Sequence, residues 1–117
     1  MKKESPLREK SLHFGLKIAE LFRLLRSTKT ETALCNQLVR SGTAIGALIR
    51  EAEYAQSKAD FISKLSIALK EANETEYWIE LLFNLGSIRN QERGILLFEL
   101  REIIKMLIAS IKTAKGM

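Results

Sequence analysis

Apolar residues recur every three to four positions along four stretches of the chain, with polar residues between them. This spacing is typical of amphipathic α-helices that bury one stripe. The pattern predicts helices over about residues 6–26, 30–54, 58–85 and 91–112. The expected buried stripes are Leu7, Phe14, Ile18, Leu21 and Leu25; Leu34, Leu38, Gly42, Ile45, Ile49 and Ala52; Phe61, Leu65, Ala68, Leu69, Ala72, Ile79 and Phe83; and Leu97, Leu100, Ile104, Leu107 and Ile111.

Capping residues stand at most of the expected helix ends. Ser5 precedes Pro6, a suitable first helical residue, and Ser57 precedes the third stretch. Residues 28–31 read as a capping box for the second helix, and Gly86 is a natural C-cap for the third. The connections are short, so neighbouring helices must run antiparallel. We therefore predict an all-α fold, an antiparallel up-down-up-down four-helix bundle that forms a single domain over residues 1–117.

Two glycines lie one turn apart inside the second predicted helix, at Gly42 and Gly46. A glycine within a helix costs about 1 kcal/mol relative to alanine. Close approach of a neighbouring helix compensates for that cost, because no Cβ separates the two backbones. We expect such a contact at both positions.

The composition narrows the class of protein. Apolar residues make up 46% of the chain, which favours a packed protein over a disordered one. Cys35 is the only cysteine, and the chain offers neither a signal-peptide pattern nor the roughly 20 apolar residues that span a bilayer. These features predict a cytoplasmic protein that is not embedded in a membrane.

The residue patterns of catalytic and metal sites are missing from the sequence. His13 is the only histidine, and no Glu-x-x-His motif of di-iron bundles occurs. We expect a surface role for His13 and a buried, unreactive thiol at Cys35. The carboxylates Glu71, Glu74 and Glu80 are expected to be solvated and to form salt bridges. Glu76 is expected to meet a hydroxyl or an arginine, for instance Arg40 or Arg50. We predict a non-enzyme with no metal and no cofactor.

Positive charge is concentrated at the two ends of the sequence. Residues 1–30 hold eight lysines and arginines against three glutamates, and residues 87–117 hold six against three. The first and last helices are neighbours in the predicted bundle, so their charges can form one basic surface that attracts a polyanion such as RNA or DNA. The alternative is that these side chains only solvate the helices. The candidate nucleic-acid-binding residues are Arg8, Lys10, Lys17, Arg23, Arg26, Arg93, Arg101, Lys105 and Lys112, with Lys17, Arg23, Arg101 and Lys105 the strongest.

The third and fourth predicted helices carry apolar residues outside their buried stripes. Isolated exposed apolar residues are common in monomers, but grouped ones more often mark a protein interface. We favour self-association. The candidate interface residues are Ile67, Trp78, Leu81, Leu85, Ile95, Phe98 and Met106.

One run of the sequence resembles a known family. The segments SGTAIGA (41–47), AQSKADF (55–61), LSIALKEA (65–72) and ETEYW (74–78) resemble bacterial four-helix-bundle proteins encoded within intervening sequences of large-subunit ribosomal RNA genes. The resemblance covers about residues 37–85. It implies four antiparallel helices and a ring-shaped homopentamer without established catalytic activity. It also implies kinship with the accessory variability determinant of diversity-generating retroelements, a basic pentamer that binds nucleic acid and a reverse transcriptase.

Two classes of function follow from these patterns. The chain is either an oligomer that binds nucleic acid, with structured RNA favoured, or a structural adaptor that binds a protein partner. In the second case the basic charge serves only solubility. Salt-dependent retention on RNA distinguishes the two.

Overall fold

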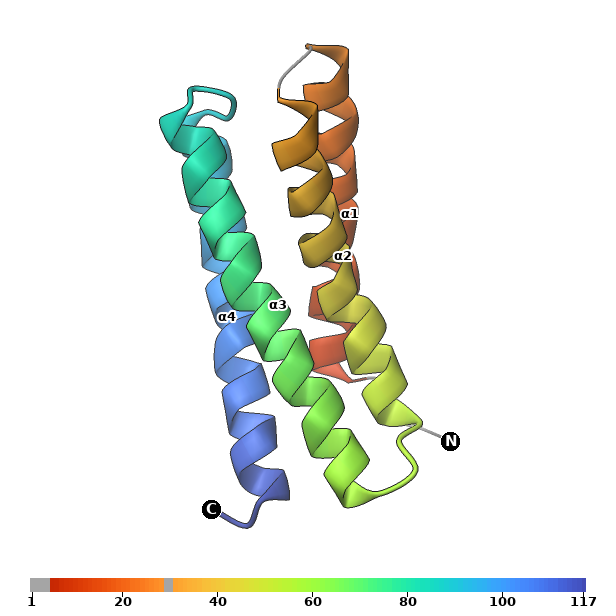
Figure 1. The fold of residues 1–117 in the computed structure, drawn as a ribbon. Helices are drawn as coiled ribbons and strands as arrows, with labels where there is room; N and C mark the ends of the chain where they lie inside the picture. The colour runs from red at the N-terminus through yellow and green to blue at the C-terminus, as the bar shows by residue number, and fades with distance from the viewer. Residues whose placement is uncertain (1–4, 29–30) are drawn as a thin grey trace.

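Four helices account for nearly all of the computed structural model, which describes residues 5–28 and 31–117. They are α1 (Pro6–Ser27), α2 (Thr32–Glu53), α3 (Lys58–Asn84) and α4 (Asn90–Ala114). Each helix runs antiparallel to the next, and α4 returns beside α1 (Figure 1). This arrangement confirms the predicted all-α four-helix bundle.

The helix ends follow from local sequence at most of the predicted positions. The Ser5 and Ser57 hydroxyls accept hydrogen bonds from the backbone N–H groups of Arg8 and Asp60, at 3.3 and 3.0 Å. Gly86 has a φ of +82°, and Ser87 N–H donates to the Leu82 carbonyl at 2.9 Å, as in a Schellman cap. The α2 prediction was wrong in detail, since α2 is capped by Glu31 without a side-chain hydrogen bond. Positions 29 and 30 of the predicted capping box lie outside the described residues.

The predicted apolar stripes form the core of the bundle. The stripe residues of α1 are all buried, and most of those on the other helices are buried as well. The pattern missed Leu82 and Ile103, which are both fully buried. Each lies beside a predicted stripe, and the width of a helix's buried face depends on how its two neighbours are placed.

The two α2 glycines face α1 at different distances. A Cβ added at Gly42 would lie 3.0 Å from two side-chain carbons of Ile18. A Cβ added at Gly46 would lie 3.4 Å from the Ser11 carbonyl oxygen, an ordinary contact distance. Gly42 is therefore the position where the backbone must be bare, while Gly46 has a little room.

Two hydroxyls are buried between α2 and α3. The Thr75 hydroxyl donates to Ser41 Oγ at 2.9 Å, and it also lies 2.8 Å from the Glu71 carbonyl oxygen. Both side chains are fully buried. A buried polar group that lacks a partner costs free energy, so this pair ties the facing positions of the two helices together.

Thr75→Val is expected to lower the free energy of unfolding by about 1–2 kcal/mol, because it removes the hydroxyl that meets Ser41. The double variant Ser41→Ala/Thr75→Val should cost less than the sum of the single changes, since neither buried partner is then left alone. Urea denaturation of the three variants measures both effects. Additive costs would mean that the two hydroxyls are not coupled.

Candidate nucleic-acid interface

The bundle brings the two basic helices together, as the topology predicted. α1 and α4 pack against each other and run antiparallel, so the end of α1 lies near the start of α4 (Figure 1). The nine predicted basic residues therefore all lie on two neighbouring helices. Their carboxylate neighbours decide how much of that charge is available to a ligand.

Carboxylates on α4 pair with two of the α1 cations. Lys17 Nζ lies 2.6 Å from Glu99 Oε2, and Lys10 Nζ lies 3.3 Å from Glu102 Oε1. At the start of α1, Arg8 Nε lies 3.6 Å from Glu53 Oε1 of α2. These ion pairs link neighbouring helices and reduce the positive electrostatic field of α1.

Two arginines of α4 pair instead with the acidic helix α3. Arg93 Nη2 donates to Glu80 Oε2 at 2.9 Å, and its guanidinium lies 4.8 Å from the centre of the Phe83 ring. The hydrogen bonding between Arg93 and Glu80 raises the pKa of the arginine and lowers the pKa of the glutamate. Arg101 Nη2 donates to Glu76 Oε2 at 3.2 Å. The expectation that Glu76 meets an arginine is therefore confirmed, but the arginine is Arg101 of α4 and not Arg40 or Arg50 of α2.

Four of the nine candidates have no carboxylate partner among the described residues. Arg23 and Arg26 lie at the far end of α1, and Lys105 and Lys112 lie in the second half of α4. All four are exposed. Because the two helices are antiparallel, these side chains form two groups toward opposite ends of the bundle.

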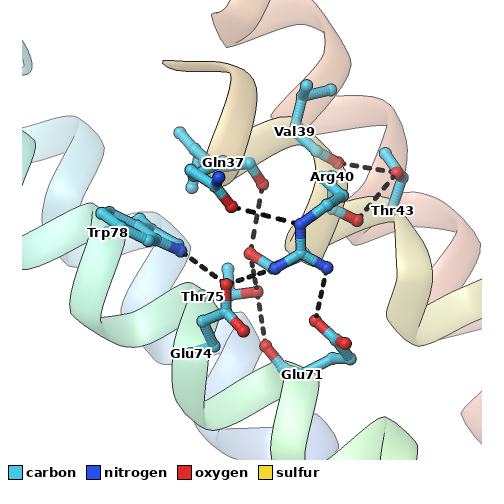
Figure 2. A network of polar contacts seen from close by, with 10 residues as sticks. Gln37, Val39, Arg40, Thr43, Glu71, Glu74, Thr75 and Trp78 are labelled. Atoms are coloured by element: carbon cyan, nitrogen blue, oxygen red, sulfur yellow. Dashed lines mark hydrogen bonds and ion pairs between the residues drawn. The ribbon is translucent and has the colours of Figure 1, made fainter. Parts of the chain in front are cut away.

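The α2–α3 side holds a dense polar network. Figure 2 shows Arg40 of α2 between Glu71 and Glu74 of α3, with Trp78 on the other side of Glu74. Trp78 Nε1 donates to Glu74 Oε2 at 2.9 Å. This hydrogen bond, and then the one from Arg40, lower the pKa of Glu74, so its carboxylate stays ionised at neutral pH. The network confirms that the α3 carboxylates form salt bridges.

The predicted self-association residues divide by exposure. Ile67, Leu85, Ile95 and Phe98 are exposed, whereas Trp78, Leu81 and Met106 are half-buried. Trp78 and Met106 pack against the core. Phe98 stands apart from the others because Arg101 and Lys105 lie beside it in the same surface hollow.

Sequence reasoning missed two surface features. One is the neighbourhood of Phe98, whose signal in the sequence is an aromatic residue followed by basic residues at intervals of three and four. The other is a groove of about 310 Å³ between α1 and α2, where Leu12 and Leu16 are 52% and 56% exposed. Its signal is two leucines one turn apart, outside the buried stripe of α1.

Cys35 and His13 are the only cysteine and histidine in the sequence. The described residues contain no group of three His, Cys, Asp or Glu side chains that could hold a metal ion. Cys35 is buried, and burial followed by the charge of Glu31 raises the pKa of its thiol. His13 is exposed and has its Nε2 3.9 Å from Glu99 Oε1. None of the helices, as described, is long and apolar enough to span a membrane.

The chain resembles known proteins over almost its whole length. The family model for the 23S rRNA-intervening sequence protein matches residues 3–109. Among solved structures, the chain is similar to a crystal structure described as a protein of unknown function from the S23 ribosomal protein family of Bacteroides thetaiotaomicron VPI-5482. The two chains share 50% sequence identity with a TM-score of 0.88, over 91% of this chain and 98% of that one. No curated protein matches the chain significantly.

Proposed function

Because the chain belongs to the family of 23S rRNA-intervening sequence proteins, we propose that it is a non-catalytic homo-oligomer that binds structured RNA. The observation that carries this proposal is the set of four exposed cations on α1 and α4 without carboxylate partners among the described residues. A protein keeps such charges available when its ligand is a polyanion. The formal net charge of +5 supports the same conclusion.

The contact with RNA is expected to be electrostatic in the main. We expect the four unpaired cations to contact phosphates, which carry no sequence information. They are Arg23, Arg26, Lys105 and Lys112. The cations that pair with carboxylates contribute to the positive electrostatic field but are less available for direct contact with phosphates. They are Lys10, Lys17 and Arg101. Binding should therefore weaken steeply with salt, by a slope of about 0.7–0.9 in log K against log salt for each neutralised phosphate.

A gel-shift series tests the proposal. Wild-type protein should retain a folded RNA at low salt more tightly than an unrelated DNA duplex, and it should release both as the salt concentration rises. Absence of any shift with either nucleic acid at the lowest salt concentration would contradict the proposal.

Self-association is the second part of the proposal, and a pentamer is the favoured state. It is supported by exposed or half-buried apolar residues: Ile67, Trp78 and Leu81 on α3, Leu85 directly after it, and Ile95 and Met106 on α4. A ring would repeat the basic side of each subunit and raise avidity for one folded RNA. Light scattering coupled to size exclusion should give a mass about five times that of one chain. A monomer at micromolar concentration would contradict it.

The second candidate function is an adaptor that binds a protein. The α1–α2 groove favours it, because Leu12 and Leu16 are exposed there beside Gly15 and Ala47. An apolar groove of this kind suits an amphipathic helix of a partner. This reading replaces the first one if no nucleic acid binds at any salt concentration.

A further inference from the structure

Phe98 is an aromatic side chain in an unusual place. It lies near the middle of α4, where 67% of its surface is exposed. Among the described residues, the other large apolar side chains at least as exposed are Tyr54, which follows α2, and Met117 at the chain end, while Leu12, Leu16 and Tyr77 inside helices are 52–58% exposed. A rigid ring at the middle of an outward helix face presents a flat apolar surface to solvent.

The space around the ring is open on two sides. Helical side chains lean toward the N-terminus of their helix, so Phe98 leans over Gly94, one turn before it. A Cβ added at Gly94 would meet nothing within 4 Å. A hollow of about 450 Å³ lies on this side, with Arg101 and Lys105 in its lining. A second hollow of about 590 Å³ lies toward α1, and its lining holds Lys10 and His13 together with Glu9, Glu99 and Glu102.

Charges of both signs surround Phe98, with Arg93, Arg101 and Lys105 in the hollow along α4 and three glutamates in the hollow toward α1. The two nearest carboxylates, Glu99 and Glu102, are held by Lys17 and Lys10 of α1. Arg101 contacts Glu76, yet 57% of its side chain remains exposed. Lys105 has no carboxylate partner within residues 5–28 and 31–117. Along the helix axis Arg101 and Lys105 lie about 4.5 and 10.5 Å beyond Phe98.

We propose that the strip of Gly94, Phe98, Arg101 and Lys105 on α4 binds an unpaired nucleotide of RNA. The base stacks on the Phe98 ring above the bare backbone of Gly94, and Arg101 and Lys105 hold the adjoining phosphates. Stacking on an aromatic side chain requires a base that has left its duplex, so the preferred RNA has a loop or bulge. This inference rests on the proposed function and names the part of the RNA that is bound.

The composition of the strip argues against a subunit contact at Phe98. The core of a protein interface is depleted of lysine and glutamate. Here the two hollows beside the ring are lined mainly by charged residues. On the side along α4, Arg101 and Lys105 border the ring, and an aromatic ring beside cations is an arrangement by which proteins hold single-stranded nucleic acid.

Two substitutions separate stacking from simple apolar contact. Phe98→Leu keeps an apolar side chain but removes the ring, and Phe98→Trp keeps a ring. The control is Tyr77→Leu on α3, which removes an aromatic ring of similar exposure, 58%. The probes are a dye-labelled RNA hairpin with an unpaired loop and a blunt RNA duplex of the same length, titrated at one low salt concentration and followed by anisotropy.

Wild-type protein should bind the hairpin more tightly than the duplex. Phe98→Leu should weaken hairpin binding about tenfold while leaving duplex binding within about twofold, because only the stacked base is lost. Phe98→Trp should bind the hairpin like wild type, and its added indole emission should be quenched by the hairpin. Tyr77→Leu should match wild type on both probes.

Other results would overturn the inference in distinguishable ways. Unchanged hairpin binding by Phe98→Leu would remove the stacking role while leaving the proposed RNA binding intact. An equal loss on both probes together with a smaller mass in light scattering would make Phe98 a contact between subunits. If wild type binds neither probe, the proposed function itself fails and the stacking site fails with it.

Discussion

Exchange of Arg23, Arg26, Lys105 and Lys112 for glutamate is expected to abolish retention on RNA, with binding weakened at least about a hundredfold at low salt. These side chains are exposed and lack carboxylate partners among the described residues, so they are available to phosphates. Each lost phosphate contact should also reduce the salt slope by about one. Gel shifts at several salt concentrations measure both effects.

The choice of these four positions depends on the structure. Lys17 and Arg101 were among the strongest candidates by sequence, but they pair with Glu99 and Glu76. A glutamate at either position would face another carboxylate, and a loss of binding could then reflect a loss of stability. Reversal of the unpaired cations should leave helicity and oligomer mass unchanged.

A charge-matched control separates a local surface from net charge. Lys105→Glu/Lys112→Glu should weaken RNA binding far more than Lys58→Glu/Lys70→Glu, which makes the same change of charge on α3. Similar losses from the two pairs would mean that RNA responds only to the overall charge. If the quadruple variant keeps the wild-type slope of log K against log salt, the RNA binds another face of the protein.

Gly42→Leu is expected to lower the free energy of unfolding by about 3 kcal/mol, the upper part of the usual overpacking range. The new Cβ would lie 3.0 Å from two carbons of Ile18, which is completely buried in the core. The Ile18 side chain or the two helices must shift to make room for the new side chain. Urea denaturation followed by circular dichroism measures the change.

Gly15→Leu is the matched control for this prediction. A Cβ at Gly15 meets nothing within 4 Å, so the change should leave the unfolding free energy unaltered or raise it by up to about 1 kcal/mol through helix propensity. If Gly42→Leu proves as stable as wild type, helix propensity outweighs the contact with Ile18. The close approach of α1 and α2 would then not be needed for stability.

Local sequence was enough to predict the four helices to within about two residues at each end. The reason is that helical periodicity and helix capping depend on contacts within one or two turns. The capping residues here are Ser5, Ser57 and Gly86. Short connections then left an antiparallel bundle as the simplest packing, and they made α1 and α4 neighbours. The burial of Cys35 followed in the same way from its place beside the α2 stripe.

Contacts between helices depended on information that no single helix contains. Whether Arg101 meets Glu76, or Arg40 meets Glu74, depends on how each helix is rotated about its axis and shifted along its neighbour. The same two variables decide that Gly42 and not Gly46 is the tight position.

At the candidate site, too, some features were determined by the sequence and others only by the packing of the helices. The sequence by itself determined that α1 and α4 carry the positive charge, because charge is a property of composition. Only the tertiary structure decided which cations lack a carboxylate partner within the described residues, and which face of α4 turns Phe98 to solvent. Those outcomes depend on carboxylates and backbones contributed by other helices, so they are settled only when the four helices pack together.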